Sequence, residues 1–281
     1  MKKYKRFFAF GCSFTHYKWA TWANVIAHSL DCEFYNFGKS GGGNSYIANQ
    51  ITQADAVFDF NTDDLVIVCW TNISREDRFR GKTWITPGNI YTQAEYDTQF
   101  VKNWADETHF ALRDYSYIRL IDNYLSKTNY HFISMCDLIQ HVNQWENTEH
   151  NANKNTQDIA SMYSSSLNKI EGNFYSVLWQ NNIDKKWKKD WRTIHRCFSD
   201  GHPTPIEHCE FVKKIFPQYL SENTEHAATK LQQHWVEYIR EGYKNSKKSH
   251  GIHEMPNEWQ EFLFKKFSLT NSLPIPHQIF N

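Results

Sequence analysis

The sequence predicts a three-layer α/β/α (flavodoxin-like) fold, with a mostly parallel sheet of about five strands between two layers of helices. Two observations predict it. Strand-like apolar runs alternate with segments of helical periodicity, an order typical of parallel strands joined by right-handed helical crossovers. In addition, the run from Asp64 to Trp70 is almost continuously apolar, as expected for a central strand that is covered on both faces.

The segments before this central strand supply two further strands and the helices that connect them. Short apolar runs predict strands at 6–11 and 33–37, and an apolar stripe over 17–30 predicts the helix between them. The next helix is expected from Asn44, with Asn44 or Ser45 as its N-cap. Its apolar positions repeat at helical spacing, namely Ile47, Ile51, Ala54 and Phe58.

Beyond the central strand the pattern is less regular. Residues 73–95 are rich in Arg, Gly and Thr and are expected to form an irregular loop, and a long helix is expected over about 97–126. A fourth strand is expected at 130–135 and a fifth at 174–179. The stretch 141–173 is polar and weakly periodic, so we interpret it as part of an insertion or a lid.

A strong helix-start signal lies near residue 204. Thr204 is the expected N-cap, Pro205 occupies the first turn, and Glu207 completes a capping box. We expect this helix to end near Leu220.

The chain is therefore expected to divide into two parts. An α/β/α domain spans 1–222, with an insertion or lid region at 141–198. A C-terminal helical extension spans 223–281, with helices at about 225–243 and 257–267.

Charge and composition exclude several classes of protein. The chain has 31 basic and 31 acidic side chains, so no net charge draws it to nucleic acid or to an anionic membrane. No apolar run reaches the length of about 18 residues needed to span a membrane, and the N-terminal apolar stretch is too short for a signal peptide. Six cysteines without a C-x-x-C pair argue against a zinc ribbon, a redox pair and a disulfide framework. We expect a cytoplasmic protein, and a virus-encoded or particle-associated protein stays an alternative.

Histidine and tryptophan are both frequent. The 14 histidines include no H-x-x-x-H or H-E-x-x-H pattern, so we expect neither a metal ion nor a cofactor. Aromatic residues make up 16% of the chain, and 11 of them are Trp. An aromatic core accounts for many of these, but some Trp side chains are expected on a surface that grips a flat ligand such as a sugar or a base.

Polar side chains follow the predicted strands at the edge where parallel sheets bind ligands. Ser13 follows the first strand, Gly41 lies in the loop after the second, and Asn72 follows the third. Asp200 and His202 directly precede the capped helix. A serine beside a histidine with an acidic partner can act as an activated nucleophile. Taken one at a time, each segment also fits an ordinary helix cap or turn.

Taken together and in order, these segments resemble the four blocks of the SGNH (GDSL-type) hydrolase family. The resemblance spans roughly residues 6–220 and implies that Ser13, in G-C-S-F-T, is the nucleophile of a catalytic triad with His202 and Asp200. Cys12 stands where the family usually has Asp. Asp200 precedes His202 by two residues, where three is common in the family.

The same resemblance implies an oxyanion hole. Its donors are the main-chain N–H groups of Ser13 and Gly41 and the side-chain amide of Asn72. Because three glycines follow one another, Gly42 or Gly43 is the alternative main-chain donor.

The resemblance therefore implies a serine esterase that needs no cofactor. We expect it to remove an acyl group, such as acetyl, from a carbohydrate or another small ester. Side chains that could contact this substrate are Trp70, Arg75, Trp187 and Trp191. The oligomeric state is not predicted.

Two other functions stay open. The first is a binding or structural module with the same fold and a degraded triad, which holds a glycan or a partner protein. The second is a nucleic-acid-associated protein acting through the basic, Trp-containing segment 184–196. The zero net charge argues against nucleic acid as a partner.

Overall fold

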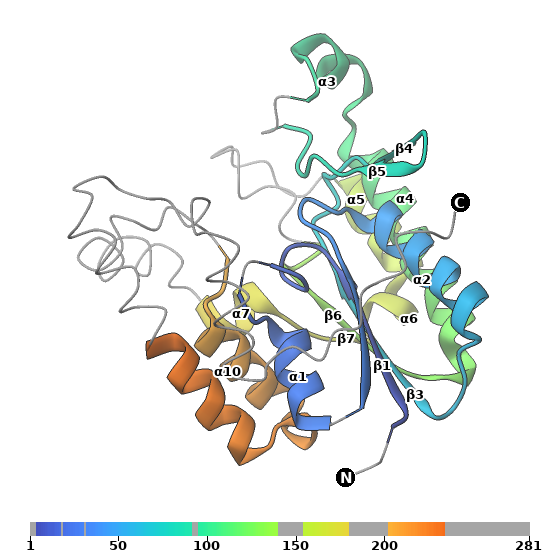
Figure 1. Cartoon of the computed structure of the whole chain (residues 1–281). Helices are drawn as coiled ribbons and strands as arrows, with labels where there is room; N and C mark the ends of the chain where they lie inside the picture. The colour runs from blue at the N-terminus through green and yellow to red at the C-terminus, as the bar shows by residue number, and fades with distance from the viewer. Residues whose placement is uncertain are drawn as a thin grey trace, which may run out of the picture.

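The structure is a computed structural model, and it describes residues 4–17, 19–30, 32–91, 95–139, 154–179 and 202–233. Within these residues a sheet lies between two layers of helices (Figure 1). The predicted three-layer α/β/α fold is therefore confirmed.

The main sheet has five described strands, all parallel, in the order β2-β1-β3-β6-β7. Their bounds are Arg6–Gly11 (β1), Glu33–Gly38 (β2), Asp64–Trp70 (β3), Asn129–Ser134 (β6) and Ile170–Asn173 (β7). Numbered along the chain, this is the 2-1-3-4-5 order of flavodoxin-like sheets. In such sheets the connections change direction between the first and third strands, and ligands bind beyond the carboxyl ends of the strands at that point. The end of β1 is therefore the place to look for a site.

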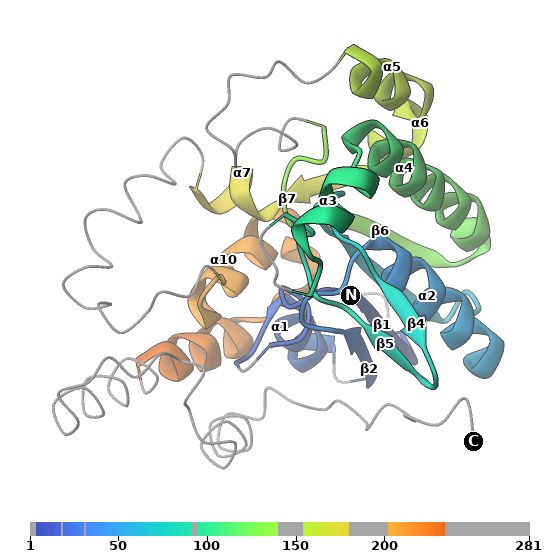
Figure 2. The same ribbon diagram turned by 90° about the horizontal axis from the view of Figure 1, so that it is seen from above.

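Helices cover both faces of the sheet (Figures 1 and 2). One face carries α1 (Trp22–Leu30) and α10 (Pro205–Ile215), with the short α7 (Phe174–Trp179) beside α10. The opposite face carries α2 (Asn44–Phe58), α4 (Glu107–Tyr124) and α6 (Ser164–Leu167), and α5 (Lys154–Met162) packs against α4.

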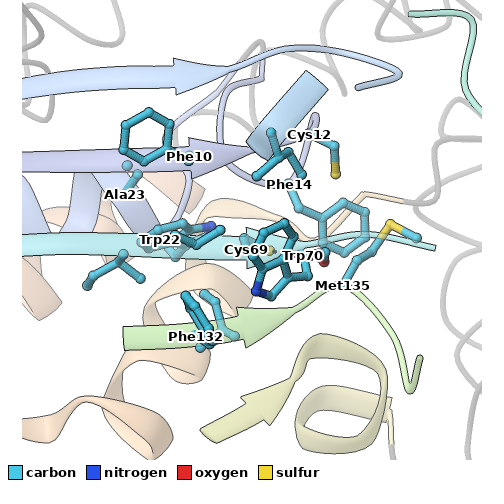
Figure 3. Packing of buried hydrophobic residues seen from close by; sticks show 14 of the residues in the cluster. Phe10, Cys12, Phe14, Trp22, Ala23, Cys69, Trp70, Phe132 and Met135 are labelled. Carbon is cyan, nitrogen blue, oxygen red and sulfur yellow. Dashed lines mark hydrogen bonds between the residues drawn. The ribbon is translucent and has the colours of Figure 1, made fainter. Parts of the chain in front are cut away.

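Aromatic side chains form much of the core. Phe7, Phe8 and Phe10 of β1 stack on their register partners in β2 with ring centroids 4.9–5.1 Å apart. Each such pair contributes about 0.5–1.5 kcal/mol beyond its buried area. Near the centre of the sheet, Trp70 packs edge-on against Phe132 at 5.5 Å (Figure 3). Much of the aromatic content therefore lies inside the protein.

The N-terminus of α2 differs from the prediction. The N-cap is Gly43, and neither Asn44 nor Ser45 caps the helix. The Asp77 carboxylate, from the loop after β3, accepts hydrogen bonds from the N–H groups of Gly43 and Tyr46 instead. The N-terminus of α2 is therefore capped by a carboxylate from a distant loop, and the predicted local side chain does not cap it.

The predicted irregular loop at 73–95 contains a short antiparallel hairpin, formed by β4 (Arg78–Arg80) and β5 (Thr83–Ile85). Figure 1 shows this hairpin at the same end of the molecule as the carboxyl ends of the main strands. Lys39 Nζ donates to Trp84 O at 2.9 Å, and Thr86 Oγ1 donates to Ser40 O at 2.9 Å. These bonds fix the hairpin to the loop between β2 and α2.

The helix expected over 97–126 is divided in two, α3 (Thr98–Trp104) and α4. Asp97 caps the first helix by accepting from Phe100 N, and Asp106 caps the second by accepting from Thr108 N and His109 N. Two aspartates therefore start two helices where the apolar pattern alone indicates one.

The fifth strand was predicted at the wrong place. Residues Phe174–Trp179 form α7, and the strand is β7, directly before it. The Asn173 side chain accepts a hydrogen bond from Ser176 N at 2.8 Å, which starts a helix at this position. Because β7 and the two helices before it lie within 154–173, this part of the expected insertion contributes an edge strand to the main sheet.

The capping box at Thr204 is confirmed, with Glu207 accepting from Thr204 N at 2.8 Å. The helix ends at Ile215, earlier than predicted, and Pro217–Tyr219 forms a 3₁₀ turn after it. Residues 222–233 are helical. The rest of the expected C-terminal extension and the segments 140–153 and 180–201 lie outside the described residues, so the domain division stays a prediction. Among the residues that the structure does describe, no helix has both the length and the apolar character needed to cross a membrane.

Candidate active site

Ser13 lies in a tight turn at the carboxyl end of β1. Thr15 N and His16 N both donate to Cys12 O, at 2.9 and 3.2 Å. The turn requires glycine at position 11, because a Cβ atom there would lie 2.0 Å from Thr15 Oγ1. Ser13 is 4% exposed, so its hydroxyl is held at the edge of the sheet and largely shielded from water.

His202 contacts Ser13 directly. His202 Nε2 and Ser13 Oγ are 2.7 Å apart, although the residues are separated by 189 positions in the sequence. The serine hydroxyl donates to Nε2 when the imidazole carries its proton on Nδ1. This is the geometry required of a nucleophile and its general base.

The imidazole of His202 is held by aromatic neighbours. The Tyr17 ring stacks on it with centroids 3.9 Å apart and planes 16° apart, and Phe14 packs on it at 5.4 Å. The next residue, Pro203, accepts a hydrogen bond from Trp19 Nε1 at 2.7 Å. The segment after Ser13 therefore orients the ring that faces Ser13. Sequence reasoning missed this role of Tyr17 and Trp19.

The loop between β2 and α2, here called the glycine loop (residues 39–43), contains the three candidate glycine donors, and two of them are already paired. Gly42 N donates to Lys39 O, and Gly43 N donates to Asp77. Among the described residues, Gly41 N and Ser13 N have no hydrogen-bond acceptor. This favours Gly41 over Gly42 and Gly43 as the main-chain donor of the predicted oxyanion hole.

Gly41 can be no other residue. Its φ is +73°, in the region that favours glycine. A Cβ atom there would also lie 2.0 Å from Thr86 O. The segment directly after β5 therefore packs on the glycine loop at Gly41.

Asn72 lies in the loop after β3, here called the Asn72 loop (residues 71–77). Its Oδ1 accepts from Ser74 N at 2.7 Å, which fixes the orientation of the amide. Nδ2 has no acceptor within the described part of the chain. Asn72 is 6% exposed, so it keeps an unused donor at the same edge as Ser13.

A buried polar network that the sequence analysis missed ties these two loops together. Asn44 and Thr71 form a reciprocal pair of hydrogen bonds, both 2.9 Å long, and Asn44 Nδ2 also donates to Asp114 at 2.8 Å. Arg113 donates to Asp114 at 2.6 Å and to Arg75 O at 2.7 Å. Burial raises the pKa of Asp114 to about 6, and the adjacent Arg113 opposes this rise.

One sequence signal could have revealed this network. Asp114 lies on the apolar stripe of the predicted helix, together with Ala111, Tyr115 and Ile118. A carboxylate on a buried helical face requires partners, and here these partners are the loops of the site.

The predicted substrate contacts have different outcomes. Trp70 is 0% exposed, so its indole has no surface that a substrate could reach, and that prediction is wrong. Trp70 is the last residue of β3, a strand whose residues are all buried, so its side chain lies in the core. Arg75 is partly buried and donates to Gly42 O at 2.8 Å, so it lies beside the glycine loop. Asp200, Trp187 and Trp191 lie outside the described residues, and their roles stay predictions.

The thiols of Cys69 and Cys136 do not compete with Ser13 as nucleophiles. Burial raises the pKa of Cys136 to about 12 and also raises the pKa of Cys69. Both thiols are therefore neutral near pH 7 and are poor nucleophiles. In the part of the chain that the structure describes, no group of three or more His, Cys, Asp or Glu side chains is placed to hold a metal ion.

No protein-family model and no curated protein matches the sequence. The solved structures to which the chain is similar include the following three. A member of the lipolytic protein G-D-S-L family from Veillonella parvula DSM 2008 is 12% identical, and the match covers 76% of this chain and 98% of that chain with a TM-score of 0.42. A GDSL-like lipase from Bacteroides thetaiotaomicron VPI-5482 is 15% identical, with coverages of 78% and 88% and a TM-score of 0.42. An acetylxylan esterase from Geobacillus stearothermophilus is 14% identical, with coverages of 79% and 100% and a TM-score of 0.42. Likeness at this level assigns no activity, so the function must be inferred from the geometry around Ser13 and His202.

Proposed function

We propose that the protein is a serine hydrolase that cleaves ester bonds, with Ser13 as the nucleophile and His202 as the general base. The observation that carries this proposal is the 2.7 Å separation of Ser13 Oγ and His202 Nε2. The order of the motifs around these residues, which resembles that of SGNH hydrolases, supports it.

The reaction proceeds in two stages. In acylation, Ser13 Oγ attacks the ester carbonyl carbon and its proton moves to His202 Nε2. The C–O bond to the alcohol then breaks, and His202 returns the proton to the departing alkoxide. In deacylation, water attacks the acyl-serine ester, His202 takes the water's proton and passes it to Ser13 Oγ, and a carboxylic acid leaves.

The negative charge that develops on the carbonyl oxygen needs donors. Ser13 N, Gly41 N and Asn72 Nδ2 supply them in our proposal, and all three lack an acceptor among the described residues. Because they are already fixed before substrate binds, they need no reorganisation in the transition state. Losing one such donor costs about 3–4 kcal/mol of transition-state stabilisation.

Asp200 completes the proposed triad. By the motif resemblance it accepts from Nδ1 of His202, which keeps the proton on that nitrogen and leaves Nε2 to face Ser13. The stack of Tyr17 on the ring supports the same orientation.

For the substrate, we propose an acyl ester, such as an acetyl ester, of a carbohydrate or another small molecule. The motif resemblance and the Trp content of the chain support this choice. The alternative of a binding module with a degraded triad is not favoured, because a degraded site has no need of a serine–histidine hydrogen bond beside three unused donors.

The test is covalent labelling with an alkyl fluorophosphonate, followed by intact mass and peptide mapping. We expect one adduct, on Ser13, that is lost in Ser13→Ala and in His202→Ala. Matched controls are Ser161→Ala and His109→Ala, which change exposed residues away from the site. Folded protein that takes up no adduct would leave the binding module as the better account.

A further inference from the structure

The Arg75 side chain extends from the Asn72 loop to the glycine loop. Its Nη1 donates to Gly42 O at 2.8 Å, and its Nη2 lies 3.5 Å from Met135 Sδ. Met135 directly follows β6, at the carboxyl end of the sheet (Figure 3). The guanidinium is therefore placed between the glycine loop and the end of β6.

This guanidinium has no counter-ion among the residues that the structure describes. Within the described residues, no carboxylate oxygen lies within 4.0 Å of it. Its Nε is buried and has no hydrogen-bond partner there. Its neighbours differ, because Arg78 and Arg113 both pair with Glu76, at 2.7 and 2.6 Å.

The nearest carboxylate does not fill this role. Asp77 feels the charge of Arg75, which lowers its pKa against the effect of burial. Its oxygens, however, accept from the N–H groups of Gly43 and Tyr46 at the start of α2. Asp77 is therefore committed to capping the helix.

Three further titratable groups that feel the charge of Arg75 are neutral. Its charge lowers the pKa values of Cys69, Cys136 and Tyr175, but burial raises all three by more. A partly buried cation that is not paired with a carboxylate is costly unless an anion joins it. Nη1 and Nη2 each retain a second N–H, and a guanidinium with two such donors matches the oxygens of a carboxylate or a phosphate.

We propose that Arg75 binds an anionic group of the ester substrate, a carboxylate or a similar oxyanion, and so selects anionic esters. This inference rests on the proposed esterase function, because Gly42 directly follows the proposed oxyanion donor Gly41. An anion held at Arg75 lies in the same cluster of loops as the ester carbonyl.

The test compares two esters that differ in one charge, 4-acetoxybenzoate and its neutral methyl ester. We expect the wild-type protein to have a kcat/KM at least about tenfold higher for the charged ester, which is the size expected for one charge-assisted pair. Arg75→Met should abolish this preference, mainly through KM, so that the ratio of kcat/KM between the charged and the neutral ester falls to about one. Arg75→Lys should retain part of it. The control is Arg78→Met, which changes an exposed arginine paired with Glu76.

A second readout does not require turnover. Fluorophosphonate labelling of Ser13 should be slowed by benzoate or phenyl phosphate and not by benzamide, and Arg75→Met should remove this protection. Comparing the two anions identifies which oxyanion is preferred. An equal loss on both esters in Arg75→Met, or no anion protection of a labelled Ser13, would overturn the proposal for Arg75. A folded protein without any Ser13 labelling would instead overturn the esterase function itself.

Discussion

The Tyr17 ring lies flat against the His202 imidazole, with centroids 3.9 Å apart, while His202 Nε2 faces Ser13 Oγ at 2.7 Å. Tyr17 belongs to the segment after β1, and His202 to the segment just before α10. The stack therefore joins the segment of Ser13 to that of His202 and limits rotation of the imidazole.

From this relationship we expect Tyr17→Ala to lower kcat about tenfold, because a misplaced base loses part of its effect on proton transfer. KM should change little, since the stack does not bind the ester. Tyr17→Phe keeps the ring and should retain most activity. Steady-state kinetics on 4-nitrophenyl acetate would measure both, and equal activity of the Ala and Phe variants would contradict the positioning role.

Gly41 provides a second prediction with a matched control. Gly41→Ala should lower both stability and activity, because its Cβ would meet Thr86 O at 2.0 Å in addition to the strain of φ +73°. Gly81 also has a positive φ, +64°, but its Cβ would meet nothing within 4 Å. Gly81→Ala should therefore cost only the backbone term of about 1–2 kcal/mol. Urea unfolding and ester hydrolysis would be measured for both, and normal activity in folded Gly41→Ala, which keeps its main-chain N–H, would contradict the expectation that displacing the glycine loop impairs the site.

The cap on α2 leads to a third prediction. Asp77→Ala should cost about 1–2 kcal/mol of stability, and it should also lower kcat/KM, because Gly43 belongs to the glycine loop. Asp97→Ala removes a comparable cap from α3, where Asp97 accepts from Phe100 N at 2.7 Å. This control should lose similar stability and keep full activity. If both variants kept full activity at matched stability, Asp77 would serve only the helix.

Most of the sheet could be predicted from the sequence, because local pattern determines it. The apolar runs at β1 and β3 coincide with the observed strands. The edge strand β7 could not be predicted, because it is only four residues long and contains Gly172. Its identity depends on pairing with β6, a tertiary contact that leaves no periodic signal.

The candidate site divides in a similar way. Ser13 and His202 could be named as candidates because the motifs around them occur in a recognisable order, and the structure brings Ser13 Oγ and His202 Nε2 within 2.7 Å. Asp77 and Asp114 were missed because their partners come from elements far away in the sequence. In the sequence alone, a charged residue whose hydrogen-bond partners lie in distant loops cannot be distinguished from an ordinary surface residue.

Asp114 provides the last prediction, a pH dependence. Its pKa in the folded protein, about 6, lies above the ordinary value of 3.8, so between these values the folded state binds the proton more tightly than the unfolded state. The contribution of this group is therefore complete below about pH 3.8 and is lost as the pH rises through 6. Asp114→Asn should flatten this part of the stability profile, measured by urea unfolding at several pH values, whereas the exposed control Asp158→Asn should not. An unchanged slope would mean that Asp114 ionises normally. Because Asp114 also holds Asn44 between the two loops, a flattened slope that is accompanied by a lower kcat would show that the same carboxylate couples stability to the geometry of the site.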